Sequence, residues 1–179
     1  MARIDLEKVA KDKGLKYFLI SFVDLFGVLR SKLVPVRAIK GMQKDGAGFA
    51  GFAAWLDLTP ADADMFAVPD PDSLIILPWR RDVGWLASDL YIDGKELAAS
   101  PRVALKQQIK KAATMGFTFK TGVEGEFHLI KEDGSGIYDD RDIQEKPCYD
   151  QSALMRRYDV ISEICDAMVE FGWGAYQND

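Results

Sequence analysis

The sequence has few of the residues on which metal, redox and hydrolytic sites most often depend. It holds two cysteines, Cys148 and Cys165, and a single histidine, His128. The cysteines form no Cys-x-x-Cys pair, which excludes zinc and thiol–disulfide motifs, and one histidine excludes any mechanism that needs two from this chain. We expect both cysteines to be reduced thiols, with Cys165 serving as a small apolar residue on a helix.

Long apolar runs and an excess of positive charge are also missing. No apolar run approaches the roughly 18 residues that a membrane span needs, and the first residues lack the apolar core of a secretion signal. The 23 Lys and Arg against 28 Asp and Glu leave a net charge of −5, which argues against nucleic-acid binding through a basic surface. We expect a cytoplasmic protein with neither nucleic acid nor membrane as a partner.

The composition is otherwise that of a globular protein. The 179 residues are 48% hydrophobic and 28% charged, enough to bury the core of one large or two small domains. Up to residue 92 the pattern predicts helices and strands in an α+β unit with a mainly antiparallel or mixed sheet. The expected helices are 3–13 and 35–42, and the expected strands are 16–24, 28–34, 73–77 and 83–91.

The pattern changes at Ser100-Pro101, a capping serine followed by proline at the first helical position. The residues that follow predict a helix that Gly116 ends, a strand over 117–130 and a long helix over 152–171. Residues 173–177 resemble the beginning of one more strand, so we expect a domain that continues beyond residue 179.

Residues 46–55 are rich in glycine and aromatic side chains and carry no charge. A flexible linker would be polar. The segment is therefore either a tightly packed, turn-rich part of the core or a loop whose aromatic side chains line a pocket or a subunit interface.

Two acidic residues stand out in the second half. Alternate residues of a strand share a face, so Glu124 and Glu126 would lie about 7 Å apart on one face, together with His128. Two carboxylates so close repel each other unless one is protonated or a cation lies beside them, and hard cations such as Mg²⁺ or Mn²⁺ prefer such ligands. The alternative is a solvated strand face without function, with His128 hydrogen-bonded or solvated rather than a third ligand.

These residues also carry a resemblance. The stretch 122–127, Gly-Val-Glu-Gly-Glu-Phe, resembles the Glu-x-Glu-Phe motif of the glutamine synthetase family. The stretches 22–27, 63–65, 68–71 and 100–102 resemble, in the same order, the family's early strand-turn, its acidic latch, its Pro-Asp turn and the Pro-Arg that starts its first catalytic helix. The resemblance implies a β-grasp N-terminal domain over 1–97 and the first, incomplete part of an α/β catalytic domain over 98–179.

The resemblance implies roles for three residues. Glu124 and Glu126 match two metal-ligand positions, one for each of two Mg²⁺ or Mn²⁺ ions, and Asp64 matches a catalytic acidic residue that the N-terminal domain presents to a neighbouring subunit. A homo-oligomer with a shared active site is therefore expected. His128 stands where the family usually has an aromatic residue and receives no role. The glutamate- and nucleotide-binding residues would lie beyond residue 179, so this stretch alone is expected to be inactive.

The implied activity is an ATP-dependent glutamate–ammonia ligase that forms glutamine through γ-glutamyl phosphate. Residues 47–50, Ala-Gly-Phe-Ala, depart from the family's Asp-Gly-Ser-Ser and lack the aspartate that would deprotonate ammonium. One alternative is a γ-glutamylamide synthetase that uses methylamine or another amine, with Phe49, Phe52 and Trp55 around the alkyl group. Two others are an inactive regulatory or structural paralogue, against which the intact Glu124 and Glu126 pair counts, and an unrelated α+β binding domain.

Overall fold

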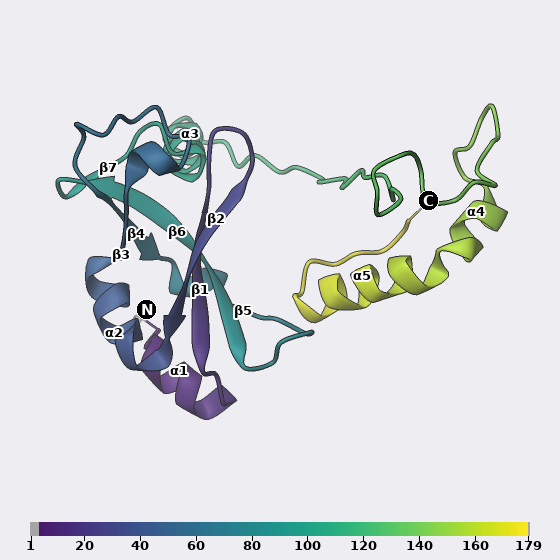
Figure 1. Ribbon diagram of the computed structural model, residues 1–179. Coiled ribbons are helices and arrows are strands. Elements are labelled where there is room, and N and C mark those ends of the chain that lie inside the picture. The colour runs from purple at the N-terminus through teal and green to yellow at the C-terminus, as the bar shows by residue number, and fades with distance from the viewer. Residues whose placement is uncertain (1–3, 179) are drawn as a thin grey trace. The chain divides into compact units, whose positions relative to one another are not determined.

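The structure is a computed structural model that describes residues 4–178 and divides into two compact units, which meet between Phe119 and Lys120. The first unit is a mixed sheet with helices, and the second consists of two helices and irregular segments (Figure 1). Each unit is described on its own.

The described part of the first unit contains a seven-stranded sheet with the order β2-β1-β6-β4-β3. Both β5 and β7 pair with β6. The strands β1 and β6 run parallel, and the other pairs are antiparallel, as expected of a mixed sheet. The bounds are β1 Tyr17–Val23, β2 Leu29–Pro35, β3 Ala47–Phe49, β4 Met65–Pro69, β5 Ile75–Ile76, β6 Val83–Ile92 and β7 Lys95–Glu96. The strands β3 and β4 were not predicted from the sequence.

The long strand β6 occupies the centre of this sheet because alternate side chains along it are buried. Leu86 and Leu90 are fully buried, and both belong to the hydrophobic core. At Gly84 the backbone approaches a neighbouring side chain closely, since a Cβ there would lie 2.9 Å from Cδ1 of Phe18. The glycine thus leaves room for the ring of Phe18, its register partner on β1.

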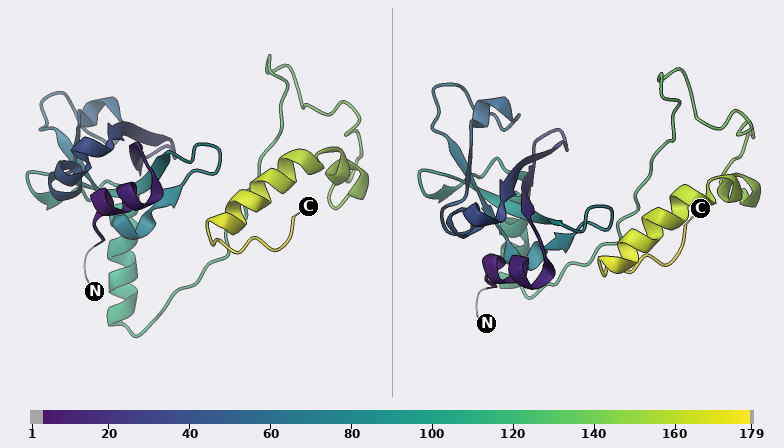
Figure 2. Two further views of the ribbon diagram at one scale, coloured as in Figure 1. Left: turned by 90° about the horizontal axis from the view of Figure 1, so that it is seen from below. Right: turned by 60° about the horizontal axis from the view of Figure 1, so that its bottom comes forward.

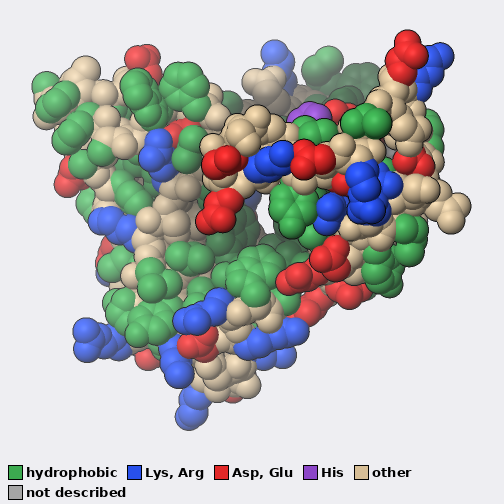
Figure 3. Space-filling model, turned by 45° about the vertical axis from the view of Figure 1, so that its right-hand side comes forward, with side chains coloured by type: hydrophobic (Ala, Val, Ile, Leu, Met, Phe, Trp, Pro, Cys, Tyr) green, Lys and Arg blue, Asp and Glu red, His purple; other side chains and the backbone are tan. Residues whose placement is uncertain are grey.

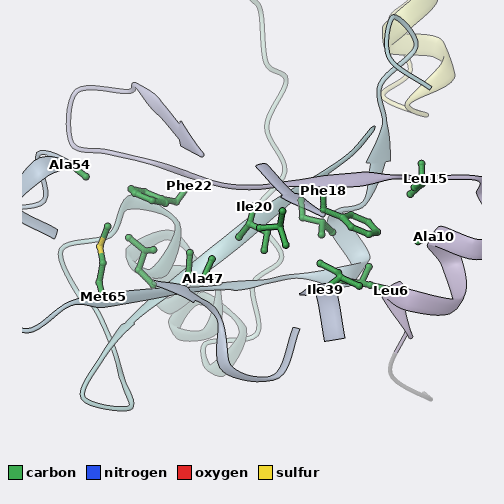
Figure 4. Close-up of a cluster of buried hydrophobic side chains, with 14 of the residues drawn as sticks. Leu6, Ala10, Leu15, Phe18, Ile20, Phe22, Ile39, Ala47, Ala54 and Met65 are labelled. Carbon is green, nitrogen blue, oxygen red and sulfur yellow. The ribbon is translucent and has the colours of Figure 1, made fainter. Parts of the chain in front are cut away.

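Three helices accompany the sheet: α1 Leu6–Lys13, α2 Val36–Asp45 and α3 Pro101–Thr114. The Asp5 carboxylate caps α1 by accepting from two backbone N–H groups, and Gly14 ends it at a φ of 70°. Side chains from α1 and α2 meet those of the strands in one core (Figure 4). In α3 only the first turns are buried, with Val103 at the contact, and the rest of the helix extends from the sheet (Figure 2).

The second unit corrects three expectations from the sequence. The strand predicted over 117–130 does not form. Residues 117–128 pair with no other described strand, and a strand needs such a partner for its backbone hydrogen bonds; only its end contacts another segment, where Ile130 forms an isolated bridge with Ile137. The long helix predicted over 152–171 is broken at Arg157 (φ −120°, ψ 18°) into α4 Gln151–Arg156 and α5 Tyr158–Glu170. Residues 173–177 form no strand.

Both units expose hydrophobic side chains among their charged ones (Figure 3). Within residues 4–178, no helix combines the length and the apolar character needed to cross a membrane.

Candidate functional site

A buried carboxylate organises the turn between β1 and β2. One oxygen of Asp24 accepts from the backbone N–H groups of Phe26 and Val28, at 2.9 and 3.0 Å, and the other accepts from Nε of Arg30 at 2.8 Å. Burial by itself would raise the pKa of Asp24, but the hydrogen bond from Arg30, with those from Val28 and Phe26, outweighs it and lowers the pKa below its ordinary value. The turn is therefore held by an ionised side chain, and Gly27 completes it at a φ of 79°.

The uncharged segment 46–55 lies along this hairpin. The rings of Phe22 and Phe49 meet edge to face with centroids 5.0 Å apart, and those of Phe26 and Trp55 do so at 5.4 Å. The backbone N–H of Leu25 donates to the carbonyl of Trp55 at 3.1 Å. The aromatic side chains of the segment are thus held against the tip and inner face of the hairpin.

Some residues of the segment 46–55 are buried and others are exposed. Ala47 and Ala54 are buried in the core, as a packed, turn-rich segment requires. Phe52 and Trp55 remain 54% and 64% exposed, and their contact with a ligand or a subunit stays a prediction. Phe49 is half-buried.

A lysine from the opposite edge of the sheet reaches the same segment. Lys32 of β2 donates from Nζ to the carbonyl of Gly48 in β3, and the ammonium lies 4.9 Å from the ring centroid of Phe49. Since β2 and β3 are the two ends of the strand order, this contact shows that the sheet curls until its edges meet. The result is a positive charge on a loop that has no charged side chain of its own.

The sequence-predicted site residues are all exposed. Asp64 directly precedes β4. Glu124, Glu126 and His128 lie in the segment 117–128, which belongs to no strand. Among the described residues, no three His, Cys, Asp or Glu side chains are placed to hold a metal ion together. Two glutamates have the donor chemistry that Mg²⁺ or Mn²⁺ prefers, but the described chain adds no third ligand to them, so a site built on this pair is incomplete here.

Sequence reasoning did not find a cluster of ion pairs that joins α3 to the sheet. Arg102 donates from Nη2 to the carboxylate of Asp70 and from Nε to Oδ1 of Asp89 at 3.0 Å, and Lys106 donates to the other oxygen of Asp89. Asp70 and Arg102 belong to two stretches that carry the family resemblance. The sequence contained both residues, but nothing local indicated that they meet.

In the second unit an ion pair connects a loop to the end of α4. Arg156 donates from Nε to Asp139, and this hydrogen bond lowers the pKa of Asp139 to about 2. Beside it, the Arg157 guanidinium lies 4.5 Å from the ring centroid of Tyr138. Cys165 lies, as expected, on the apolar side of α5, where Leu154, Tyr158 and Ile161 line a groove with it.

Comparisons with known proteins place these features in a family. A model of the glutamine synthetase catalytic domain matches residues 98–177. The chain is 61% identical to a glutamine synthetase of Rhizobium leguminosarum bv. phaseoli over 98% of its length, and 36% identical to a glutamate–methylamine ligase of Methyloversatilis universalis over 100% of it. These alignments cover 40% and 41% of the two relatives.

Solved structures of similar proteins support the same family assignment. A GmaS/ADP complex matches 97% of the chain with a TM-score of 0.93 at 60% identity, and ligand-free GmaS matches it with a TM-score of 0.86 at 54% identity. The alignments cover 40% and 41% of those chains. The fold is therefore that of ligases of the glutamine synthetase type, a mixed sheet with helices. The chain belongs to the glutamine synthetase family and spans about 40% of the length of its relatives.

Proposed function

We propose that the full-length protein is an ATP-dependent ligase that joins the γ-carboxylate of glutamate to a small alkylamine such as methylamine. The observation that carries the choice of amine is the loop 47–50, which lacks a carboxylate and receives the ammonium of Lys32 instead. The likeness to a glutamate–methylamine ligase over the whole chain and to GmaS at 60% identity supports it. The second candidate is a glutamate–ammonia ligase, favoured by the 61% identity to a protein named glutamine synthetase.

The reaction proceeds in two steps. The γ-carboxylate oxygen attacks the terminal phosphorus of ATP, so that an acyl phosphate forms and ADP leaves. The lone pair of the amine then attacks the carbonyl carbon, the bond from carbon to the phosphate oxygen breaks, and phosphate leaves with that electron pair while the nitrogen loses a proton. Bound Mg²⁺ or Mn²⁺ would neutralise the phosphate oxygens. Glu124 and Glu126 would hold these ions together with ligands from the rest of the protein.

We further propose that the sheet of the first unit is a β-grasp domain over residues 1–97 and that residues 98–179 begin the catalytic domain. Three features support the β-grasp assignment: the hairpin of β1 and β2, the helix α2 that follows it, and the parallel pairing of β1 with β6. The start of the matched catalytic model at residue 98 supports the boundary. The active site would be shared between subunits of a cytoplasmic homo-oligomer, and the exposed position of Asp64 suits a residue that acts in a neighbour's site.

Phosphate release by the full-length protein, with glutamate, ATP and each amine in turn, tests this proposal, and mass spectrometry identifies the amide. We expect a higher kcat/KM for methylamine than for ammonia. A higher kcat/KM for ammonia would favour the second candidate, and the absence of amide with every amine would overturn both.

A further inference from the structure

The candidate amine loop carries a cation that the chain itself supplies. Lys32 donates to the carbonyl of Gly48, and its ammonium lies over the face of Phe49. The ring of Phe49 also meets that of Phe22 edge to face, with centroids 5.0 Å apart. Lys32 therefore already occupies the two groups of this loop that would attract a cation, the carbonyl of Gly48 and the face of Phe49.

Charged groups nearby do not cancel this charge. Within residues 4–178, no carboxylate lies within ion-pairing distance of Lys32. Arg30 on the same strand pairs with Asp24, and Lys44 pairs with Asp45 at the end of α2. Other charged side chains on the packed elements and the following segment are Arg37, Lys40, Asp57, Asp62 and Asp64. An ammonium ion that approached residues 47–50 would meet a like charge, whereas a neutral amine would not.

We propose that Lys32 determines which form of the amine this loop accepts, and that it favours the unprotonated free base over the ammonium ion. The inference rests on the proposed function, and it applies whether the amine is methylamine or ammonia. An aspartate in the loop would attract the ammonium ion and take its proton. Here the charge of Lys32 repels the ammonium ion, so the loop accepts the neutral amine. The lone pair of the neutral amine is already free to attack the acyl phosphate. Phe49 then serves to seat Lys32, and Phe52 and Trp55 are the aromatic side chains left to contact an alkyl group.

The dependence of KM on pH tests this in the full-length protein. Alkylammonium ions resemble the lysine side chain, whose pKa is about 10.4, so between pH 7 and 9 the free base rises about tenfold per pH unit. We expect the KM for total methylamine to fall nearly in proportion. In Lys32→Gln, which retains a hydrogen-bond donor without the charge, we expect a KM at pH 7 lower by about fivefold and a shallower dependence on pH.

Two further variants separate charge from structure. Lys32→Arg keeps the charge and should keep the steep dependence, and Lys40→Gln removes an exposed lysine of α2 and should leave the KM unchanged. If the KM of Lys32→Gln has the wild-type value and the wild-type dependence on pH, the role of Lys32 is overturned. A KM of the wild-type protein that does not change with pH would overturn it as well. Loss of amide formation with every amine at every pH would overturn the proposed function itself.

Discussion

Arg102 in the first turn of α3 donates to the carboxylate of Asp70, which directly follows β4 and lies 32 residues earlier in the chain. Its Nε also donates to Asp89 of β6. The residues matched by the catalytic-domain model begin at 98, so these ion pairs connect the start of that region to the sheet that precedes it. They fix the direction in which the chain leaves the first unit.

The ion pairs of Arg102 should stabilise the docking of α3. Because the side chains of Arg102 and Asp89 are 31% and 13% exposed, we expect Arg102→Met to lower the free energy of unfolding by about 1–2 kcal/mol. Hydrogen exchange should accelerate in α3 more than in β1. Urea unfolding and exchange measure both effects. As a control, Arg80→Met removes a more exposed pair at 3.9 Å and should change stability by less than about 0.5 kcal/mol. Equal effects of the two substitutions would contradict the prediction.

The Asp24 carboxylate should make the hairpin sensitive to acid. Its pKa is lowered in the folded protein, so its contribution to stability is fully present above the unfolded value near 3.8 and is lost as the pH falls through the folded value. We expect Asp24→Asn to lower the urea midpoint clearly at pH 7 and much less at pH 3. Asp12→Asn, at an exposed helix position, should have little effect at either pH. A deficit of Asp24→Asn that stays constant with pH would contradict this account.

The buried hydroxyl of Ser88 has no hydrogen-bond partner in the described structure. An unpaired buried hydroxyl costs about 1–3 kcal/mol, so we expect Ser88→Ala to raise the free energy of unfolding by about 1 kcal/mol. Ser21 is the matched control, because its buried hydroxyl contacts the hydroxyl of Ser31 at 3.0 Å and Ser21→Ala should destabilise the protein. Destabilisation by Ser88→Ala would show that its hydroxyl has a partner in solution.

The metal role proposed for Glu124 and Glu126 predicts a loss of activity when either is replaced. Glu126→Ala in the full-length protein should reduce kcat by at least about 100-fold and weaken Mn²⁺ binding, because an oxygen ligand is removed. Calorimetric titration with Mn²⁺ and phosphate release measure the two effects. The 179-residue chain should bind Mn²⁺ weakly, since its described residues add no third ligand. Glu132→Ala, at an exposed glutamate of the same unit, is the control, and full activity of Glu126→Ala would end the metal assignment.

A shared active site predicts complementation between subunits. If Asp64 acts in the site of a neighbour, Asp64→Ala and Glu126→Ala should each inactivate the full-length protein, and mixed oligomers should regain part of the activity. Each productive site would take Asp64 from one subunit and Glu126 from the other. Activity of hybrids separated by affinity tags gives the measurement. Inactive hybrids, in preparations where mixing is verified, would contradict a site shared in this way.

Features that depend on short stretches of the chain could be predicted from the amino-acid sequence. The stop at Gly14 and the turn from Asp24 to Gly27 depend on hydrogen bonds or dihedral angles within a few residues, so their residue types predicted them. The cap at Asp5 is equally local but was not predicted, because the first helix was expected over 3–13. The order of the family motifs likewise depends on sequence alone. The resemblance to the family can therefore be recognised without knowledge of any tertiary contact.

Features that depend on partners distant in the chain could not be predicted in this way and became known only from the folded structure. β4 forms because β3 and β6 lie on either side of it, whereas residues 117–128 have a strand-like sequence and no strand to pair with among the described residues. The contacts of Lys32 with Gly48 and of Arg102 with Asp70 span 16 and 32 residues. Local patterns carry no information about such distant pairs, because a hydrogen bond or an ion pair forms only after the sheet has brought its two ends together.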